Sequence, residues 1–146
     1  MISELRQSKR YNDFLPISVL AISGPNNTVI AGPFSGRITD ISKTGACLLM
    51  TQVLQKTYHV YHSTIEDESL FLQLIINLPP ELTEFIIPAR PVWIDQFDIE
   101  DIKAFRMGVE FLINPEGEQI AIMERVMMKK QKDRDMLWAS MLMPRK

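Results

Sequence analysis

Short runs in which apolar and polar residues alternate, separated by turn-forming residues, occupy most of the chain up to about residue 114. Alternation with a period of two is typical of half-buried strands. The clearest case is the segment with Phe105, Met107, Val109 and Phe111 alternating with Arg106, Gly108 and Glu110. The whole pattern predicts strands over 15–23, 28–32, 36–42, 45–51, 70–79, 83–97 and 104–114, with a break between 32 and 36.

The period changes after Pro115, where Ile120, Met123, Val126 and Met127 recur at helical spacing. Pro115 and the acidic residues that follow it suit the first turn of a helix. The segment 52–69 is ambiguous and reads as a short helix followed by an acidic loop. Six or seven short strands followed by one helix predict a mainly β fold, a small antiparallel barrel or sandwich. Nothing in the chain alternates strand with helix as a Rossmann or P-loop fold requires.

The length and the bulk composition indicate one soluble globular domain. The chain has 146 residues, 46% of them hydrophobic and 23% charged, which are ordinary values. We divide it into an N-terminal arm (1–14), a strand-rich body (15–114) and a C-terminal amphipathic helix (115–143). A formal net charge of −2 gives no field that would attract a nucleic-acid polymer. No stretch is long and apolar enough to span a membrane, and the polar N-terminus has no signal-peptide pattern. We therefore expect a cytoplasmic protein.

The reactive side chains form no recognisable catalytic or metal-binding pattern. The single Cys47 lies in an apolar run and is expected to be a buried structural thiol. His59 and His62 are the only histidines, and their spacing matches no zinc pattern. Trp93 is expected in the core with the apolar residues around it. We predict no catalytic residue, no metal and no cofactor, and so no enzyme.

Two polar motifs stand out against this background. The stretch DISKTG places Asp40, Ser42 and Gly45 in the pattern D-x-S-x-x-G between two predicted strands. Upstream, RQSKR places Arg6 and Arg10 in the pattern R-x-x-x-R. Downstream, MGVEFL lies on the last predicted strand before the helix. In this order the motifs resemble the PilZ domain family, bacterial receptors for the second messenger cyclic di-GMP. Taken alone, Asp40 and Ser42 would equally suit a plain Asx- or Ser-type turn.

The resemblance implies a six-stranded antiparallel β-barrel, with the ligand lying on the barrel surface and clamped by the arm. Arg6 and Arg10 would meet phosphate or the O6/N7 edge of guanine bidentately. Asp40 would accept from N1–H and N2–H₂ of guanine, a donor pair that adenine lacks, with Ser42 beside it. Gly45 would permit either a positive φ or a close approach of the ligand to the backbone.

The arm leaves one alternative open. Five residues, YNDFL, separate Arg10 from Pro16, whereas most family members have the second arginine only a residue or two before the first strand. A second alignment therefore places Arg10 and Phe14 in the two arginine positions. We prefer Arg6 and Arg10, on the view that the arm is a loop that accepts extra length. In the second alignment the chain resembles a degenerate adaptor that binds protein partners without nucleotide.

The resemblance also implies a protein partner, in motility, secretion or polysaccharide machinery. Binding would order the arm over the barrel, and the altered surface would act on that partner. The C-terminal helix is rich in methionine, which recurs at adaptable protein contacts. Its last segment, MLWASMLM, returns to apolar character after a charged stretch. A contact there with a partner, or with a second copy in a homo-oligomer, is a further hypothesis.

Overall fold

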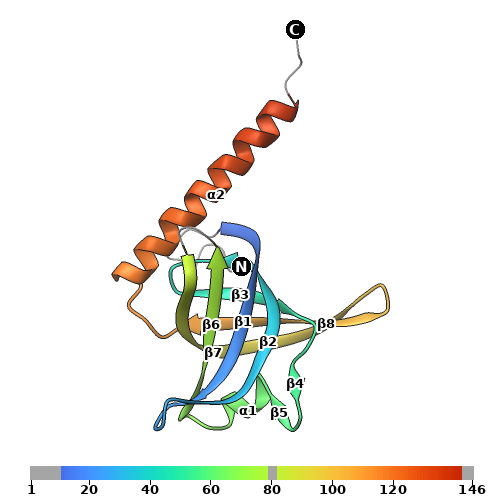
Figure 1. The fold of residues 1–146 in the computed structure, drawn as a ribbon. Coiled ribbons are helices and arrows are strands. Elements are labelled where there is room, and N and C mark those ends of the chain that lie inside the picture. The colour runs from blue at the N-terminus through green and yellow to red at the C-terminus, as the bar shows by residue number, and fades with distance from the viewer. Residues whose placement is uncertain (1–10, 79–81, 143–146) are drawn as a thin grey trace.

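Six long antiparallel strands close into a barrel in the computed structural model, which describes residues 11–78 and 82–142 (Figure 1). Their order around the barrel is β1-β2-β3-β8-β7-β6. The strands are β1 (Tyr11–Ser23), β2 (Thr28–Ile41), β3 (Gly45–Met50), β6 (Leu70–Leu78), β7 (Leu82–Ile99) and β8 (Ile102–Phe111). A single long helix, α2 (Glu118–Leu142), follows the last strand. The predicted mainly β barrel with a C-terminal helix is confirmed.

The first strand begins earlier than the sequence predicted. Residues 11–14 were assigned to the arm, but they belong to β1, where Tyr11 pairs with Ile41 and Asn12 with Asp40. They can extend the strand because the neighbouring β2 is long enough to offer them partners. The part of the predicted arm that lies before Tyr11 is outside the described residues.

The predicted break between residues 32 and 36 is a bulge within a continuous β2. Val19 pairs with Phe34, and Ala21 pairs with Ala31, so β2 advances three residues while β1 advances two. Gly32 takes a φ of +113°, and a side chain there would meet the Val19 carbonyl at 2.8 Å. Pro33 lies in this bulge. Proline has no N–H to donate to a neighbouring strand, and a bulge is one of the places where a strand tolerates it.

Alternate residues of the strands point inward and form one continuous core. Its largest fully buried side chains include Phe34, Ile38, Leu48, Met50, Leu74 and Met107. At one end of the barrel, α2 contributes Ile120, Met123, Val126 and Met127 to the same core. The predicted apolar face of the helix is therefore the one that packs. Beyond this contact, α2 continues away from the barrel (Figure 1). No helix in the described ranges is long and apolar enough to cross a membrane.

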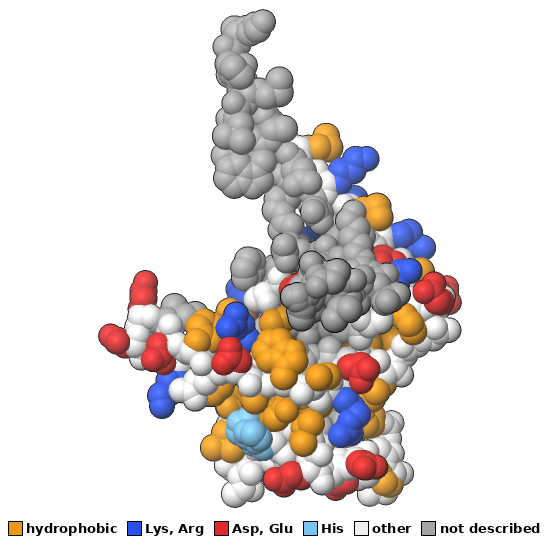
Figure 2. Space-filling view, turned by 180° about the vertical axis from the view of Figure 1, so that it is seen from behind, with side chains coloured by type: hydrophobic (Ala, Val, Ile, Leu, Met, Phe, Trp, Pro, Cys, Tyr) orange, Lys and Arg blue, Asp and Glu red, His pale blue; other side chains and the backbone are white. Residues whose placement is uncertain are grey.

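The β7–β8 hairpin projects beyond the rest of the barrel (Figure 1). Its two-residue turn consists of Glu100 and Asp101, with φ values of 48° and 71°. Two successive positive φ values are the pattern of a type I′ turn, whose twist matches that of the strands. Acidic side chains gather toward the end of this hairpin (Figure 2).

The ambiguous segment 52–69 contains a short helix, as one interpretation of it proposed. Two short strands, β4 (Leu54–Gln55) and β5 (Tyr58–His59), precede helix α1 (His62–Ile65). His59 organises this segment, because its Nδ1 accepts hydrogen bonds from the backbone N–H groups of Tyr61 and His62, both at 3.1 Å. Burial and the neighbouring His62 lower the pKa of His59 below its usual 6.5.

This geometry predicts a pH dependence of stability. A ring nitrogen that accepts two N–H groups carries no proton, so the folded state binds a proton at His59 less readily than the unfolded state. The contribution of His59 to the free energy of unfolding is therefore complete above the unfolded pKa and is lost as the pH falls below 6.5.

We expect His59→Asn to remove this dependence, because its side-chain oxygen can accept the same N–H groups without titrating. Urea unfolding of both proteins between pH 7.5 and pH 5, a range of about two to three units around the ordinary histidine pKa, measures it. The wild type should lose more stability than the variant as the pH falls. Equal losses would show that His59 does not carry the effect.

Candidate functional site

The D-x-S-x-x-G motif forms the tight turn between β2 and β3. The Ser42 backbone N–H donates to the Gly45 carbonyl at 2.9 Å and closes the turn. The Ser42 side chain is only 4% exposed, and its hydroxyl accepts from the Thr44 backbone N–H at 3.4 Å. Ser42 therefore shapes the turn, as the Ser-type turn interpretation proposed. Its contact with a ligand stays a prediction.

Of the two purposes that the sequence suggested for Gly45, a positive φ is wrong, and a close approach of the ligand to the backbone stays a prediction. Its φ is not positive. Instead, a Cβ at this position would collide with the Val109 carbonyl of β8. The neighbouring strand β8 thus lies close to Gly45, and the Phe111 N–H lies 2.8 Å from the Thr44 carbonyl. The glycine thus lets the turn lie directly against β8.

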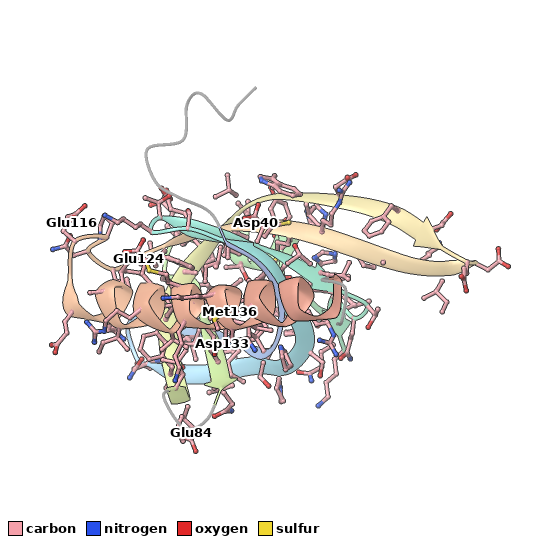
Figure 3. All side chains as sticks on the ribbon, turned by 90° about the horizontal axis from the view of Figure 1, so that it is seen from above. Asp40, Glu84, Glu116, Glu124, Asp133 and Met136 are labelled. Atoms are coloured by element: carbon pink, nitrogen blue, oxygen red, sulfur yellow. The ribbon has the colours of Figure 1, made fainter. Side chains whose placement is uncertain are left out.

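Asp40 lies at the end of β2, on the side of α2 opposite Glu84 in the view down onto the helix (Figure 3). It pairs with Asn12 of β1 and Cys47 of β3. The pairing skips Thr39, since Ile38 pairs with Leu48 and Asp40 with Cys47. Such a bulge re-aims the side chains next to it. One carboxylate oxygen of Asp40, Oδ1, is buried.

The start of β1 lies beside this turn. Tyr11 pairs with Ile41, the residue between Asp40 and Ser42. Arg10 directly precedes Tyr11 in the chain, and both Arg10 and Arg6 lie outside the described residues. The expectation that YNDFL is a loop is wrong: these residues are in β1.

The extra length of YNDFL is absorbed by an irregularity in the pairing with β2. Between the pairs Asn12–Asp40 and Leu15–Ile38, β1 has one residue more than β2. The segment is therefore part of the barrel wall. The backbone of Phe14, the alternative second arginine position, lies within this irregular part of β1.

A row of residues on the outer surface continues from Asp40 across three more strands. Asp40 pairs with Cys47, Cys47 with Gly108, and Gly108 with Trp93. Cys47 is half-buried. The row therefore runs from β2 through β3 and β8 to β7, with a carboxylate at one end and an indole at the other.

Trp93 is not the core residue that the sequence predicted. It is 43% exposed, and its indole lies so close to Gly108 that a side chain there would collide with it. The cause is an irregularity in the register: Pro91 pairs with Val109 but Trp93 pairs with Gly108, so β7 has one residue more than β8. A hollow of about 230 Å³ lies beside the indole and reaches Ser42, Gly45 and Cys47. In the sequence, two adjacent apolar residues, Val92 and Trp93, follow Pro91, and this break in alternation was the available signal for an exposed Trp93.

Charged side chains surround this surface at separate points. Lys43, in the turn, contacts Glu116 in the connection to α2, with Nζ 3.6 Å from Oε2. Arg106 on β8 is engaged by Asp95, with Nη2 2.8 Å from Oδ2, and its guanidinium lies 5.0 Å from the centre of the Phe97 ring. Across the described part of the chain, no three His, Cys, Asp or Glu side chains gather as a metal ion would require.

These features define a class of protein, a small closed β-barrel with a polar turn and an exposed aromatic on its outer surface. The sequence profile of the PilZ domain matches residues 4–129. The chain therefore belongs to the PilZ domain family. No curated protein sequence matches the chain.

Solved structures of similar fold agree with this assignment. The Bacillus subtilis inhibitor of motility MotI/DgrA is 21% identical, with a TM-score of 0.52 over 88% of this chain and 52% of that one. The PilZ domain of Escherichia coli YcgR with c-di-GMP is 12% identical, with a TM-score of 0.54 over 94% of this chain and 98% of that one. Borreliella burgdorferi PlzA in complex with c-di-GMP is 13% identical, with a TM-score of 0.50 over 99% of this chain and 57% of that one. This chain thus spans about half the length of MotI/DgrA.

The contact between the turn and β8 gives a prediction for Gly45→Ala. The added methyl group must push the Val109 carbonyl away, and overpacking of this kind costs about 1–3 kcal/mol of unfolding free energy. Thr44→Ala is the matched control, because Thr44 is exposed and this substitution only removes atoms. Chemical denaturation measures both variants. Equal stability of Gly45→Ala and the wild type would contradict the close approach.

Proposed function

We propose that this protein is a non-enzymatic receptor for cyclic di-GMP that acts in the cytoplasm. The ligand lies on the outer surface of the barrel and contacts Arg6 and Arg10 of the arm and Asp40, Ser42 and Gly45 of the turn. One observation carries the proposal: β1 pairs with β2 so that its first described residue, Tyr11, lies opposite Ile41, inside the D-x-S-x-x-G motif. The residue that follows the R-x-x-x-R motif is therefore beside the turn.

The chemistry of the two motifs suits a guanine nucleotide. A guanidinium group meets phosphate, or the O6 and N7 atoms of guanine, through two parallel hydrogen bonds. A carboxylate accepts from the N1–H and N2–H₂ donors of guanine, which adenine does not offer. Asp40 is the only acidic residue between Gly32 and Glu66. Ser42 and Gly45 support it by keeping the turn tight against β8.

Trp93 adds a surface on which a base can stack. It lies in one row with Asp40 and is exposed beside a hollow that reaches Gly45. Stacking of a base on an aromatic side chain contributes about 1–3 kcal/mol. Asp40 would contact the edge of one guanine, and Trp93 would contact the flat face of a base. Neither motif supplies such an apolar contact.

Binding of the ligand is relayed to a protein partner. MotI/DgrA, which has a similar fold, is an inhibitor of motility, and this supports motility machinery among the expected partners, beside secretion and polysaccharide machinery. Ordering of the arm would change the surface that the partner meets. Met128 and Met136 of α2 are 53% and 62% exposed, which supports a contact of this helix with a partner or a second copy. A contact with a second copy is tested by size-exclusion chromatography of a chain ending at Lys132. An unchanged oligomeric state would contradict this contact.

A second candidate is an adaptor that binds protein partners without nucleotide. It is favoured by the alignment in which Arg10 and Phe14 fill the two arginine positions. Phe14 is part of β1, and a phenylalanine cannot pair with phosphate, so half of the clamp would be missing.

Calorimetric titration of cyclic di-GMP tests the receptor. We expect micromolar binding by the wild type, and loss of binding in Arg10→Ala and in Asp40→Asn, which removes the charge with little change in shape. Trp93→Leu should weaken binding by the stacking contribution, about 1–3 kcal/mol. Cyclic di-AMP should not bind, because adenine lacks the donor pair that Asp40 accepts.

Thermal unfolding supplies the control. A ligand that binds only the folded state raises the apparent stability, by about 2.7 kcal/mol at one hundred times its dissociation constant. Absence of both heat and a shift in the wild type would favour the adaptor. Melting of each variant without ligand shows whether it is folded, and a comparison of Arg6→Ala with Phe14→Ala decides the alignment.

A further inference from the structure

A second and larger hollow lies on the outer surface of the barrel. The row from Asp40 to Trp93 separates it from the D-x-S-x-x-G turn. Its volume is about 570 Å³, within the range of small-molecule sites. Four neighbouring strands, β6, β1, β2 and β3, form it. Its lining includes Ser18, Ser35, Arg37, Leu49, Ile75 and Asn77. We call it the β2 hollow.

The lining has the chemistry of a site for a phosphorylated nucleoside. Among the described residues, Arg37 is the single charged residue that lines it, and no carboxylate does. Leu49 and Ile75 are half-buried and give an apolar surface for the face of a base. The hydroxyls of Ser18 and Ser35 and the amide of Asn77 can pair with base or ribose edges.

The β2 hollow lies close to the D-x-S-x-x-G motif on the barrel surface. Arg37 and Asp40 lie three residues apart on β2, about 10 Å along a strand. On β3, Leu49 pairs with Arg37 and Cys47 with Asp40. Two adjacent rows on one surface thus carry a carboxylate and a guanidinium, and one extended ligand can contact both.

We propose that the β2 hollow binds the second nucleotide unit of the same ligand molecule, with Arg37 pairing with a phosphate. This inference rests on the proposed function, in which Asp40 reads the first guanine. It assigns to Arg37 and the hollow a part of the ligand that neither motif contacts. A ligand with two bases and two phosphates would then contact both rows at once.

The barrel offers a matched control for the charge of Arg37. Leu49 pairs with Arg37 on one side and with Arg106 on the other. The two arginines therefore flank the same residue, and Arg106 contacts Asp95 and lies over the Phe97 ring. Removal of either changes the net charge by the same amount, while only Arg37 lines the β2 hollow.

Calorimetric titration of cyclic di-GMP into the full chain tests the proposal. We expect Arg37→Ala to weaken binding about ten- to hundred-fold, as for the loss of a hydrogen bond to a charged group, with unchanged stoichiometry. Arg106→Ala should bind as the wild type does. Ser35→Trp should fill the hollow and weaken binding similarly, without loss of folding, because the Ser35 side chain is exposed.

The outcomes separate the two proposals. If the wild type does not bind, the proposed function fails and this inference fails with it. If Asp40→Asn abolishes binding while Arg37→Ala and Ser35→Trp bind as the wild type does, only this inference is overturned. A fall from two bound ligands to one in Arg37→Ala, at unchanged affinity, would mean that the hollow binds a separate molecule, and would also overturn it. Equal melting temperatures of the unliganded proteins establish that each variant is folded.

Discussion

Closure of the barrel is the constraint on which the candidate site depends. A six-stranded barrel closes only if β1 pairs on both sides, with β2 along one edge and with β6 along the other. That double pairing fixes where the chain enters the barrel. Because Tyr11 lies opposite Ile41, the entry point coincides with the D-x-S-x-x-G turn. Tyr11, the residue that follows the R-x-x-x-R motif, is thereby brought beside a motif about thirty residues later in the sequence by backbone hydrogen bonds.

Local irregularities in the strands then determine which side chains face outward at that place. A bulge at Thr39 precedes Asp40, and another between Pro91 and Trp93 turns the indole outward over Gly108. In a regular strand an inserted residue reverses the face of every residue after it. A bulge absorbs the inserted residue, so the surface changes only at the bulge and the core on either side keeps its pattern. Gly45 and Gly108 complete the arrangement, since a side chain at either position would collide with a neighbour.

The sequence predicted the fold well because the period-two pattern reports burial directly. Met107 and Phe111 were expected on an inward face and are buried there, and Ile120 and Met123 of the helix pack as predicted. What it missed depends on register, which a single strand does not encode. Trp93 was placed in the core because it is apolar, and its exposure follows only from the pairing of β7 with β8. The role of Gly45 likewise depends on β8, more than sixty residues later in the chain.

The attachments of the turn indicate where a signal would arise. The turn is joined to β8 by the backbone bond between Phe111 and Thr44 and by the close packing of Gly45. Both resist displacement, because a lost buried backbone bond or a forced overlap is costly. The exposed contact between Lys43 and Glu116 is weak by comparison, since surface ion pairs contribute about 0–1 kcal/mol. A ligand at the turn would therefore find a preformed surface. The change that it causes is expected in the residues before Tyr11 and, through Lys43, at the connection to α2.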